Sequence, residues 1–308
     1  MKRLVFLLPI IYLSVCISCE EKETKITDEI SVYETVDNLP QLKTKLSSSF
    51  KNYWYHGDAE ITSYKLEQAR YGEIREGSAV MVFVTEDFLP DLQVKADNYS
   101  KSNIPVLKLN ATKKFNTGVY PYSIMQSTFY PVTNNNHALK VTASVQDWCG
   151  HVYAQLNNRE KFELISHSYF QEEADQNYKL SKTWTENELW VKLRIDPKSL
   201  PIGDLDIIPS LEFTRLKHQK IKAYKAYAVL KDGMYMLSYP NLNRTLKINF
   251  ENSFPYQING WEETTVSGYG SESKTLTTKA NKLETIKSAY WNKNSTADTG
   301  LRKTLKLK

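Results

Sequence analysis

Apolar and polar residues alternate along much of the chain, and this pattern predicts strands. In 139–145 and again in 246–250, apolar side chains at every second position are separated by Lys, Thr, Ser or Asn. Because successive side chains of a strand point to opposite faces, both segments predict strands with one buried face. Ala79–Val84 is continuously apolar over the length of a strand, which predicts a central strand covered on both faces.

Two polar dipeptides predict β-hairpins. Asp232-Gly233 and Asn157-Asn158 each lie between two segments of strand-like composition. Asp and Gly tolerate the positive φ angles of a type I′ turn, so the first dipeptide is the stronger hairpin signal. The 20 tyrosines of the chain are typical of extended, half-exposed strands.

Helical signals are few. Apolar residues recur at four-residue spacing within 40–55, which predicts a helix there. Thr185-Glu186-Asn187-Glu188 is a capping-box pattern that predicts a helix ending at Asp196-Pro197, and 301–307 predicts a short terminal helix. The chain is therefore expected to be mainly β (a β-rich α+β fold). It would have large antiparallel sheets, as a half-barrel or a sandwich, and a few short helices.

The N-terminus has the pattern of an exported lipoprotein. Lys2 and Arg3 precede an apolar run that ends at Ser18-Cys19, and acidic residues follow. This run is too short to span a bilayer, so a signal peptide is favoured over a transmembrane anchor. Residues 1–18 are predicted to be the signal peptide, and Cys19 the site of lipid attachment. The chain is then expected to be lipid-anchored in the cell envelope, at the outer membrane, with exposure at the cell surface as a further alternative.

The remaining chain divides into a tether and a domain. Residues 19–38 are polar and aperiodic, which is typical of a flexible tether. Residues 39–308 are predicted to form the β-rich envelope domain. Pro and Gly residues within 197–205 leave a subdivision there as an alternative.

Composition narrows the functional classes. Without Lys2 and Arg3, 38 basic residues stand against 35 acidic ones, a balance that gives no general attraction to nucleic acid. The basic stretch 215–225 is interpreted as exposed strand ends around a turn. Beyond the signal and Cys19, Cys149 is the single cysteine, so the domain has no intramolecular disulfide and no thiolate metal cluster. No histidine pair has metal-binding spacing, and no cofactor is predicted.

The segment Asp147-Trp148-Cys149-Gly150-His151 is the one candidate catalytic cluster. A cysteine nucleophile needs a nearby base such as His151 or His167 to hold it as a thiolate. His167 shares a face with His151 only if the paired residue numbers of the hairpin add to an even number. The alternative is a buried thiol in a strand beside a packed Trp, since free Cys is among the most buried residues.

Tyr53-Trp54-Tyr55 is a dense aromatic segment with two interpretations. Aromatic faces stack on sugar rings, so the three residues are a candidate glycan site. Aromatic residues also commonly pack a helix end against a sheet, and this second interpretation is favoured.

Four segments are similar to a family of lipoproteins from flavobacteria, in the Bacteroidetes group. They are AEITSYKLEQARYGEIREGSAVMVFVTEDF (59–88), PVLKLNATKKFNTGVYPYSIM (105–125), VQDWCGHVYAQLNN (145–158) and NRTLKINFENSFPYQINGWEE (243–263). Members of this family often carry the name septum formation inhibitor Maf, but the resemblance implies no established activity. True Maf proteins are cytoplasmic α/β nucleotide pyrophosphatases with an S-x-S-P-R-R motif. This chain lacks that motif, so nucleotide pyrophosphatase activity is not expected.

The sequence thus favours a non-catalytic binding or scaffolding module at the envelope. Its ligand would be a lipid, another amphiphile or a glycan, or its partner an envelope protein. A curved antiparallel sheet with an apolar concave face suits an amphiphile, although this is an argument from fold analogy. The enzymatic alternative is a hydrolase or transferase that uses Cys149 with His151 or His167.

Overall fold

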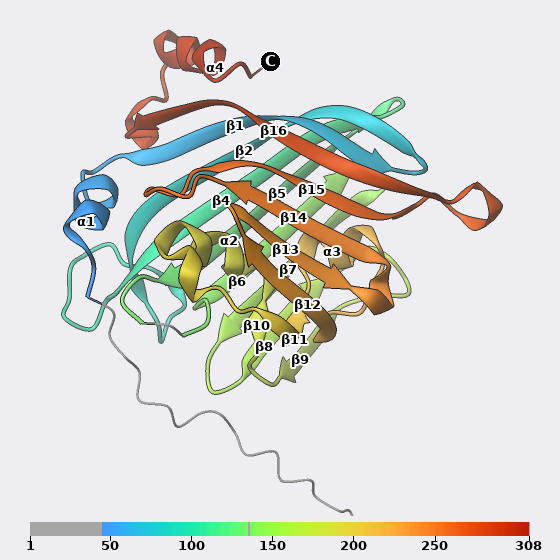
Figure 1. The fold of residues 1–308 in the computed structure, drawn as a ribbon, viewed down its shortest axis with the longest axis horizontal. Coiled ribbons are helices and arrows are strands. Elements are labelled where there is room, and N and C mark those ends of the chain that lie inside the picture. The colour runs from blue at the N-terminus through green and yellow to red at the C-terminus, as the bar shows by residue number, and fades with distance from the viewer. Residues whose placement is uncertain (1–44, 135, 308) are drawn as a thin grey trace, which may run out of the picture. The chain divides into compact units, whose positions relative to one another are not determined.

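A computed structural model describes residues 45–134 and 136–307, and these belong to one compact unit, Gln41–Lys308. The predicted signal peptide, Cys19 and the tether lie outside the described residues. The 197–205 segment lies inside this unit. Sixteen strands form one sheet, which confirms the mainly β fold class (Figure 1).

The strands are β1 (Ala59–Arg70), β2 (Glu73–Leu89), β3 (Val94–Lys95), β4 (Ile104–Thr117), β5 (Tyr120–Pro131), β6 (Lys140–Asp147), β7 (Gly150–Asn158), β8 (Phe162–His167), β9 (Gln176–Leu180), β10 (Trp184–Thr185), β11 (Gly203–Ile208), β12 (Tyr224–Lys231), β13 (Met234–Tyr239), β14 (Arg244–Phe250), β15 (Ile258–Ser267) and β16 (Lys274–Ser288). The α-helices are α1 (Ser48–Trp54), α2 (Glu186–Ile195), α3 (Leu211–Leu216) and α4 (Gly300–Thr304). The short 3-10 helices are η2 (Pro197–Ser199), η3 (Pro240–Leu242), η4 (Gly270–Glu272), η5 (Tyr290–Asn292) and η6 (Thr296–Thr299).

The strand order shows that the first and last strands pair with each other within the sheet. It runs β10-β11-β12-β13-β14-β15-β16-β1-β2-β4-β5-β6-β7-β8-β9, with β3 paired to β2. β1 pairs antiparallel with β16, and Ala59 lies opposite Ser288. β10 and β11 are parallel, while the other described pairs are antiparallel. The two terminal strands of this order, β9 and β10, are joined by residues 181–183 alone.

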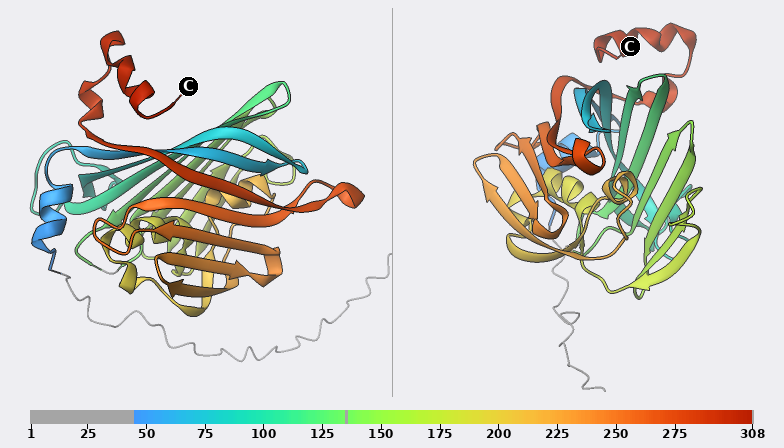
Figure 2. Two further views of the ribbon diagram at one scale, coloured as in Figure 1. Left: turned by 45° about the horizontal axis from the view of Figure 1, so that its top comes forward. Right: turned by 90° about the vertical axis from the view of Figure 1, so that its right-hand side faces the viewer.

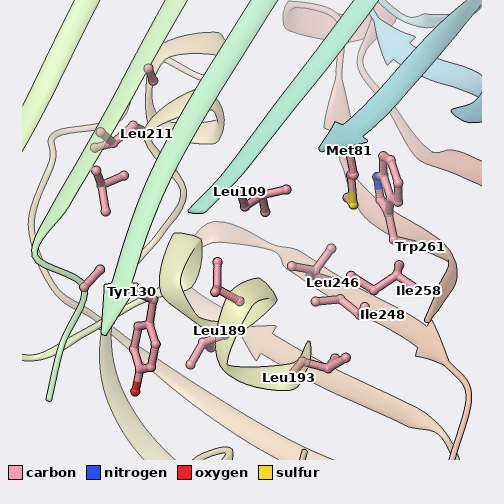
Figure 3. Close-up of a cluster of buried hydrophobic side chains, with 14 of the residues drawn as sticks. Met81, Leu109, Tyr130, Leu189, Leu193, Leu211, Leu246, Ile248, Ile258 and Trp261 are labelled. Carbon is pink, nitrogen blue, oxygen red and sulfur yellow. The ribbon is translucent and has the colours of Figure 1, made fainter. Parts of the chain in front are cut away.

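The sheet is curved, and α2 and α3 lie between its two limbs (Figure 2). The main core forms where these helices meet the inner face of the sheet. Figure 3 shows Leu189 and Leu193 of α2 among apolar side chains of the strands, which include Tyr130 and Ile248. Such burial stabilises the fold by roughly 25 cal/mol for each Å² of apolar surface removed from water.

A second, smaller cluster covers the opposite face of the central strands. Leu305, next to α4, packs with Ala59, Ile61 and Val84, and Val80 and Val82 pack against this cluster. Met81 and Phe83 point to the main core instead. The run 79–84 is therefore covered on both faces, as its continuous apolar pattern predicts.

Helix α2 is unusual because most of its charged side chains are buried. Its start is fixed by the predicted capping box, in which Thr185 and Glu188 exchange side-chain and backbone hydrogen bonds. Glu186, Glu188, Lys192 and Arg194 are all buried, although this helix is too polar in sequence to predict such a location. A buried charge is tolerated only when it is paired and hydrogen-bonded, so each of these groups needs a specific partner.

The sheet supplies those partners. Arg194 donates two hydrogen bonds to Glu60 of β1, at 2.6 and 2.7 Å, and both side chains are 1% exposed. Burial alone would raise the pKa of Glu60, but the Arg194 charge holds it below its usual value. At the other end of α2, Arg244 of β14 donates two hydrogen bonds to Glu186. These bidentate pairs fix both the position and the rotation of the helix.

Local predictions are confirmed in part. Asp232-Gly233 forms the expected two-residue turn between β12 and β13, with φ angles of 48° and 73°. The second hairpin is present, but its loop is 159–161 and not Asn157-Asn158. Both asparagines belong to β7 and pair with residues of β8. Among the described residues of the predicted helix 40–55, only Ser48–Trp54 are helical, because Ser47 accepts a hydrogen bond from Phe50 and caps the helix there.

The pair formed by Glu60 and Arg194 gives a first prediction. Replacing Glu60 by Leu leaves a buried guanidinium without its carboxylate, and we expect a loss of about 3–5 kcal/mol in the free energy of unfolding. The double variant Glu60→Leu with Arg194→Met removes both charges and should lose less than either single variant. Urea unfolding of the four proteins measures this. A double variant that loses the sum of both single losses would show that the two side chains act independently.

Candidate functional site

The structure places Cys149 in a solvent-exposed turn. Trp148 and Cys149 link β6 to β7 across the pair formed by Asp147 and Gly150. The expectation of a buried thiol beside a packed Trp is therefore wrong, and Trp148 itself is 69% exposed. The physical reason is that the strand ends at Asp147, whose carboxylate accepts a hydrogen bond from the Cys149 backbone at 2.6 Å.

The surroundings of Cys149 favour the thiol over the thiolate. The negative charge of Asp147 raises the pKa of Cys149 above its usual value of 9.0, and the positive charges of Arg215 and Arg70 oppose this only in part. Among the described residues, no hydrogen bond joins Cys149 to a histidine. A catalytic cysteine normally has a lowered pKa, so this environment is the reverse of an activated nucleophile.

The two candidate histidines lie on the outer face of the sheet. Tyr153 pairs with His167, so the paired numbers add to an even value, and His151 and His167 share the exposed face. His167 Nδ1 lies 3.3 Å from a carboxylate oxygen of Asp175, and both side chains are exposed. The structure therefore brings the two histidines to one face of the sheet, whereas Cys149 lies in the turn that precedes β7.

The aromatic segment Tyr53-Trp54-Tyr55 is divided between core and surface. Trp54 is fully buried and packs against Phe83. The Tyr53 hydroxyl donates to Glu60 at 2.5 Å, and Tyr55 is 45% exposed. Two of the three rings therefore hold α1 against the sheet, and only Tyr55 offers an open surface.

A cavity inside the curved sheet is the stronger candidate site. We call it the inner cavity; it has a volume of about 60 Å³ and lies between the sheet and helices α2 and α3. Its apolar wall includes Met81, Leu246 and Trp261, which lie close together in Figure 3. Trp190 of α2 contacts Trp261 edge-to-face, with 5.5 Å between ring centroids, and completes this wall.

The inner cavity also contains charged side chains from six helices and strands and from Lys217, which follows α3. Its cations and carboxylates are Arg70, Lys113, Lys217, Arg244, Glu186, Glu212 and Glu263. All three carboxylates have partners within this set. Arg244 binds both Glu186 and Glu263, and Lys113 donates to Glu212 at 2.7 Å.

Helix α3 holds one of these carboxylates in place. Ser210 caps the helix by accepting a hydrogen bond from the Phe213 backbone. Gln126 of β5 donates to Glu212 at 2.8 Å, and Asn187 of α2 donates to Gln126 at 2.8 Å. Burial raises the pKa of Glu212, while the nearby Lys113 charge opposes the increase.

Two cations of the inner cavity have no carboxylate partner among the described residues. Arg70 is 7% exposed and donates to the Leu216 carbonyl at 2.6 Å and to the hydroxyls of Tyr71 and Tyr122. Lys217 donates to the Val266 carbonyl at 2.6 Å, and burial lowers the pKa of its ammonium group. All the hydrogen-bond partners of these two cations are neutral, so no carboxylate of the described residues contacts either of them directly. The negative charge of Glu263 nevertheless acts on Lys217 and raises its pKa, opposing the effect of burial.

Two polar atoms at the inner cavity are also buried without a hydrogen bond. They are Nε of Arg70 and Oε1 of Gln68, and the Gln68 side chain is 4% exposed. Buried polar groups are hydrogen-bonded in the great majority of cases, so each such atom needs an explanation. A bound polar group at this position would satisfy the Arg70 donor and its charge together.

No local sequence pattern indicates the inner cavity. Gln68 and Arg70 occur at the end of a strand-like segment, where polar residues are ordinary. Leu216, which accepts a hydrogen bond from Arg70, lies 146 positions later in the chain. Lys217 follows it directly. Only the folded arrangement identifies the cluster.

The described residues contain neither a metal site nor a membrane-spanning helix. No group of three or more His, Cys, Asp or Glu side chains there is arranged to hold a metal ion. No helix within 45–134 or 136–307 combines the length and apolar character needed to cross a membrane.

No model of a known protein family matches the chain, and no curated protein matches its sequence. In fold, the chain is similar to a β-barrel-like protein of a domain of unknown function from Brucella abortus. The sequence identity is 8% and the TM-score 0.43, over 75% of this chain and 98% of that one. It is also similar to a porin-like protein from Bacteroides uniformis, with 9% identity and a TM-score of 0.21, over 73% and 95% of the two chains.

The environment of Cys149 gives a second prediction. The folded protein should react with iodoacetamide without denaturant, because the thiol is exposed. The rate should follow a pKa above 9.0, and Asp147→Asn should lower that pKa and speed the reaction near neutral pH. The pH profile of alkylation measures both. Rapid reaction at pH 6 in the unaltered protein would contradict this and would support the cysteine-dependent enzyme.

Proposed function

We propose that the protein is a binding protein that accepts an anionic amphiphile, with the charged head group in the inner cavity. The observation that carries this proposal is Arg70, a buried guanidinium with an unsatisfied Nε and no carboxylate partner among the described residues. A carboxylate or phosphate oxygen is the natural partner for such a group, because charge-assisted hydrogen bonds to guanidinium are among the strongest in proteins.

The lining of the inner cavity supports an amphiphile over a free ion. A volume of about 60 Å³ compares with the roughly 10–15 Å³ of cavity space that one buried water molecule needs, so a carboxylate fits with a few attached atoms. The apolar wall of Met81, Leu246, Trp190 and Trp261 then lies beside the first carbons of the ligand. Small-molecule sites commonly combine such apolar walls with a few placed polar groups.

The cellular setting of this function rests on the sequence. We infer that the chain is exported and lipid-anchored through Cys19 in the envelope, with residues 19–38 as a tether. An amphiphile carrier held at a membrane surface by a flexible tether would have its ligands close at hand. Amphiphile binding is chemically compatible with a location at a membrane. A scaffolding role would require an envelope partner in place of a ligand.

The proposal predicts selective binding of decanoate over decanol. Binding should quench the fluorescence of Trp190 and Trp261, because both rings line the inner cavity. Arg70→Gln and Lys217→Gln should each weaken decanoate binding by about 10- to 100-fold, the range expected for hydrogen bonds to charged groups. The exposed Lys279 of β16 offers a matched control, and Lys279→Gln should bind as the unaltered protein does.

Fluorescence titration and urea unfolding should be measured on each variant, because Arg70→Gln alters a buried residue. Lys217 is only partly buried, so its variant keeps the test valid if Arg70→Gln fails to fold. Equal binding of decanol and decanoate, or unaltered decanoate affinity in folded Lys217→Gln, would contradict the proposed head-group site.

The pH dependence of binding gives a further prediction. Burial lowers the pKa of Lys217 from its usual 10.5, and only the protonated ammonium attracts an anion. Decanoate affinity should therefore be constant around neutral pH and fall as the pH rises through this lowered pKa. Lys217→Arg should keep its affinity over the same range, because arginine does not titrate there. Titrations between pH 7 and 10 decide this, and an identical decline in both proteins would assign the effect to another group.

A further inference from the structure

A second and larger cavity lies on the other side of α3. We call it the outer cavity; it has a volume of about 570 Å³, within the range of small-molecule sites. Its apolar floor consists of Val152 and Ala154 of β7 and Leu211 of α3. Ser166 of β8, Gln176 of β9 and Gln219 after α3 add hydroxyl and amide groups.

Helix α3 separates the two cavities. Glu212, Phe213 and Leu216 line the inner cavity, whereas Thr214 and Arg215 line the outer one. The charged residues of the inner cavity are therefore not shared with the outer cavity. A ligand in the outer cavity would meet a different set of side chains.

Arg215 is the central polar group of the outer cavity. It is 9% exposed, and its guanidinium lies 4.0 Å from the centre of the Phe170 ring. One nitrogen donates to Glu173 at 3.1 Å, while Nε is buried without a hydrogen bond. Glu173 also contacts His218 at 2.8 Å and accepts from Ser168 at 2.7 Å. The Arg215 charge is thus compensated, but one of its donors is still unsatisfied.

We propose that the outer cavity binds an uncharged polyhydroxylated ligand, of the saccharide class. A hydroxyl accepts from the Nε of Arg215 without bringing a second negative charge next to Glu173. The amides of Gln176 and Gln219 both donate and accept, which matches the two roles of a sugar hydroxyl. This site is independent of the amphiphile site, because it shares none of that site's charged groups.

The aromatic and apolar surfaces suit the faces of a sugar ring. The Tyr178 hydroxyl donates to the Ile221 carbonyl at 2.7 Å, which fixes this ring as a wall of the outer cavity. The apolar floor at Val152 and Ala154 lies among the polar groups of the wall. A saccharide presents this same combination of C–H surface and hydroxyl edges. An anion would instead meet Glu172 and Glu173, and a cation would meet Arg215 and Lys220.

Saturation-transfer NMR on the full chain tests this proposal. The probes are glucose, galactose, N-acetylglucosamine and maltose, with gluconate and glucosamine as the charged counterparts. We expect at least one neutral sugar to bind, and to bind better than gluconate or glucosamine. Binding by none of the four neutral sugars, or preferred binding of a charged probe, would overturn the proposal.

Two variants locate the bound sugar. Ala154→Leu fills the floor of the outer cavity and should abolish the signal. Arg215→Lys keeps a positive charge beside Glu173 but removes Nε, and it should weaken binding by at least about tenfold. Tyr153→Leu, on the exposed face of the same strand, is the matched control and should bind normally.

The same proteins distinguish this site from the amphiphile site. Decanoate titration should be unchanged in Arg215→Lys, and sugar binding should be unchanged in Lys217→Gln. Unaltered sugar binding in both folded cavity variants would overturn the assignment to the outer cavity. Should Ala154→Leu fail to fold, Arg215→Lys decides the question alone.

Discussion

The bidentate pair between Arg194 and Glu60 is the contact on which the interior depends. A curved sheet of sixteen strands cannot bury its inner face unless another element fills the space, and α2 is that element. This helix introduces charges that must be neutralised by particular strands. Because Glu60 of β1 and Arg244 of β14 fix its two ends, α2 cannot slide or rotate without leaving a buried charge unpaired. Its apolar side chains are consequently held in one register against the sheet.

The same constraint explains why Arg70 of the inner cavity has no carboxylate partner among the described residues. Asn187 of α2 donates to Gln126, which in turn holds Glu212 of α3, so the position of the short helix follows from that of the longer one. The carboxylates within reach are then committed to Arg244 and Lys113. Arg70 is left with neutral partners only, and its positive charge is therefore available to a ligand.

Sequence patterns predicted the elements more successfully than the interior. The turn at Asp232-Gly233 and the capping box at Thr185 depend on neighbouring residues, and both were recognised. The burial of α2 cannot be predicted in this way, because its charged residues are typical of an exposed helix. Arg194 and its partner Glu60 are 134 positions apart, so no local pattern connects them. The chemistry of a thiol makes Cys149 a candidate from the sequence alone, but the end of β6 at Asp147 decides its exposure.

The pairing of β1 with β16 also determines how the chain can fold. Thr62 and Thr285 form a hydrogen bond across these strands although 223 positions separate them. Contacts of such separation form slowly, because a long loop must first be closed. A ribosome releases β1 long before β16, and until then the edges of β1 and β15 lack their shared neighbour. Unpaired edges attract other strands, so the nascent protein passes through a stage in which it needs protection from aggregation.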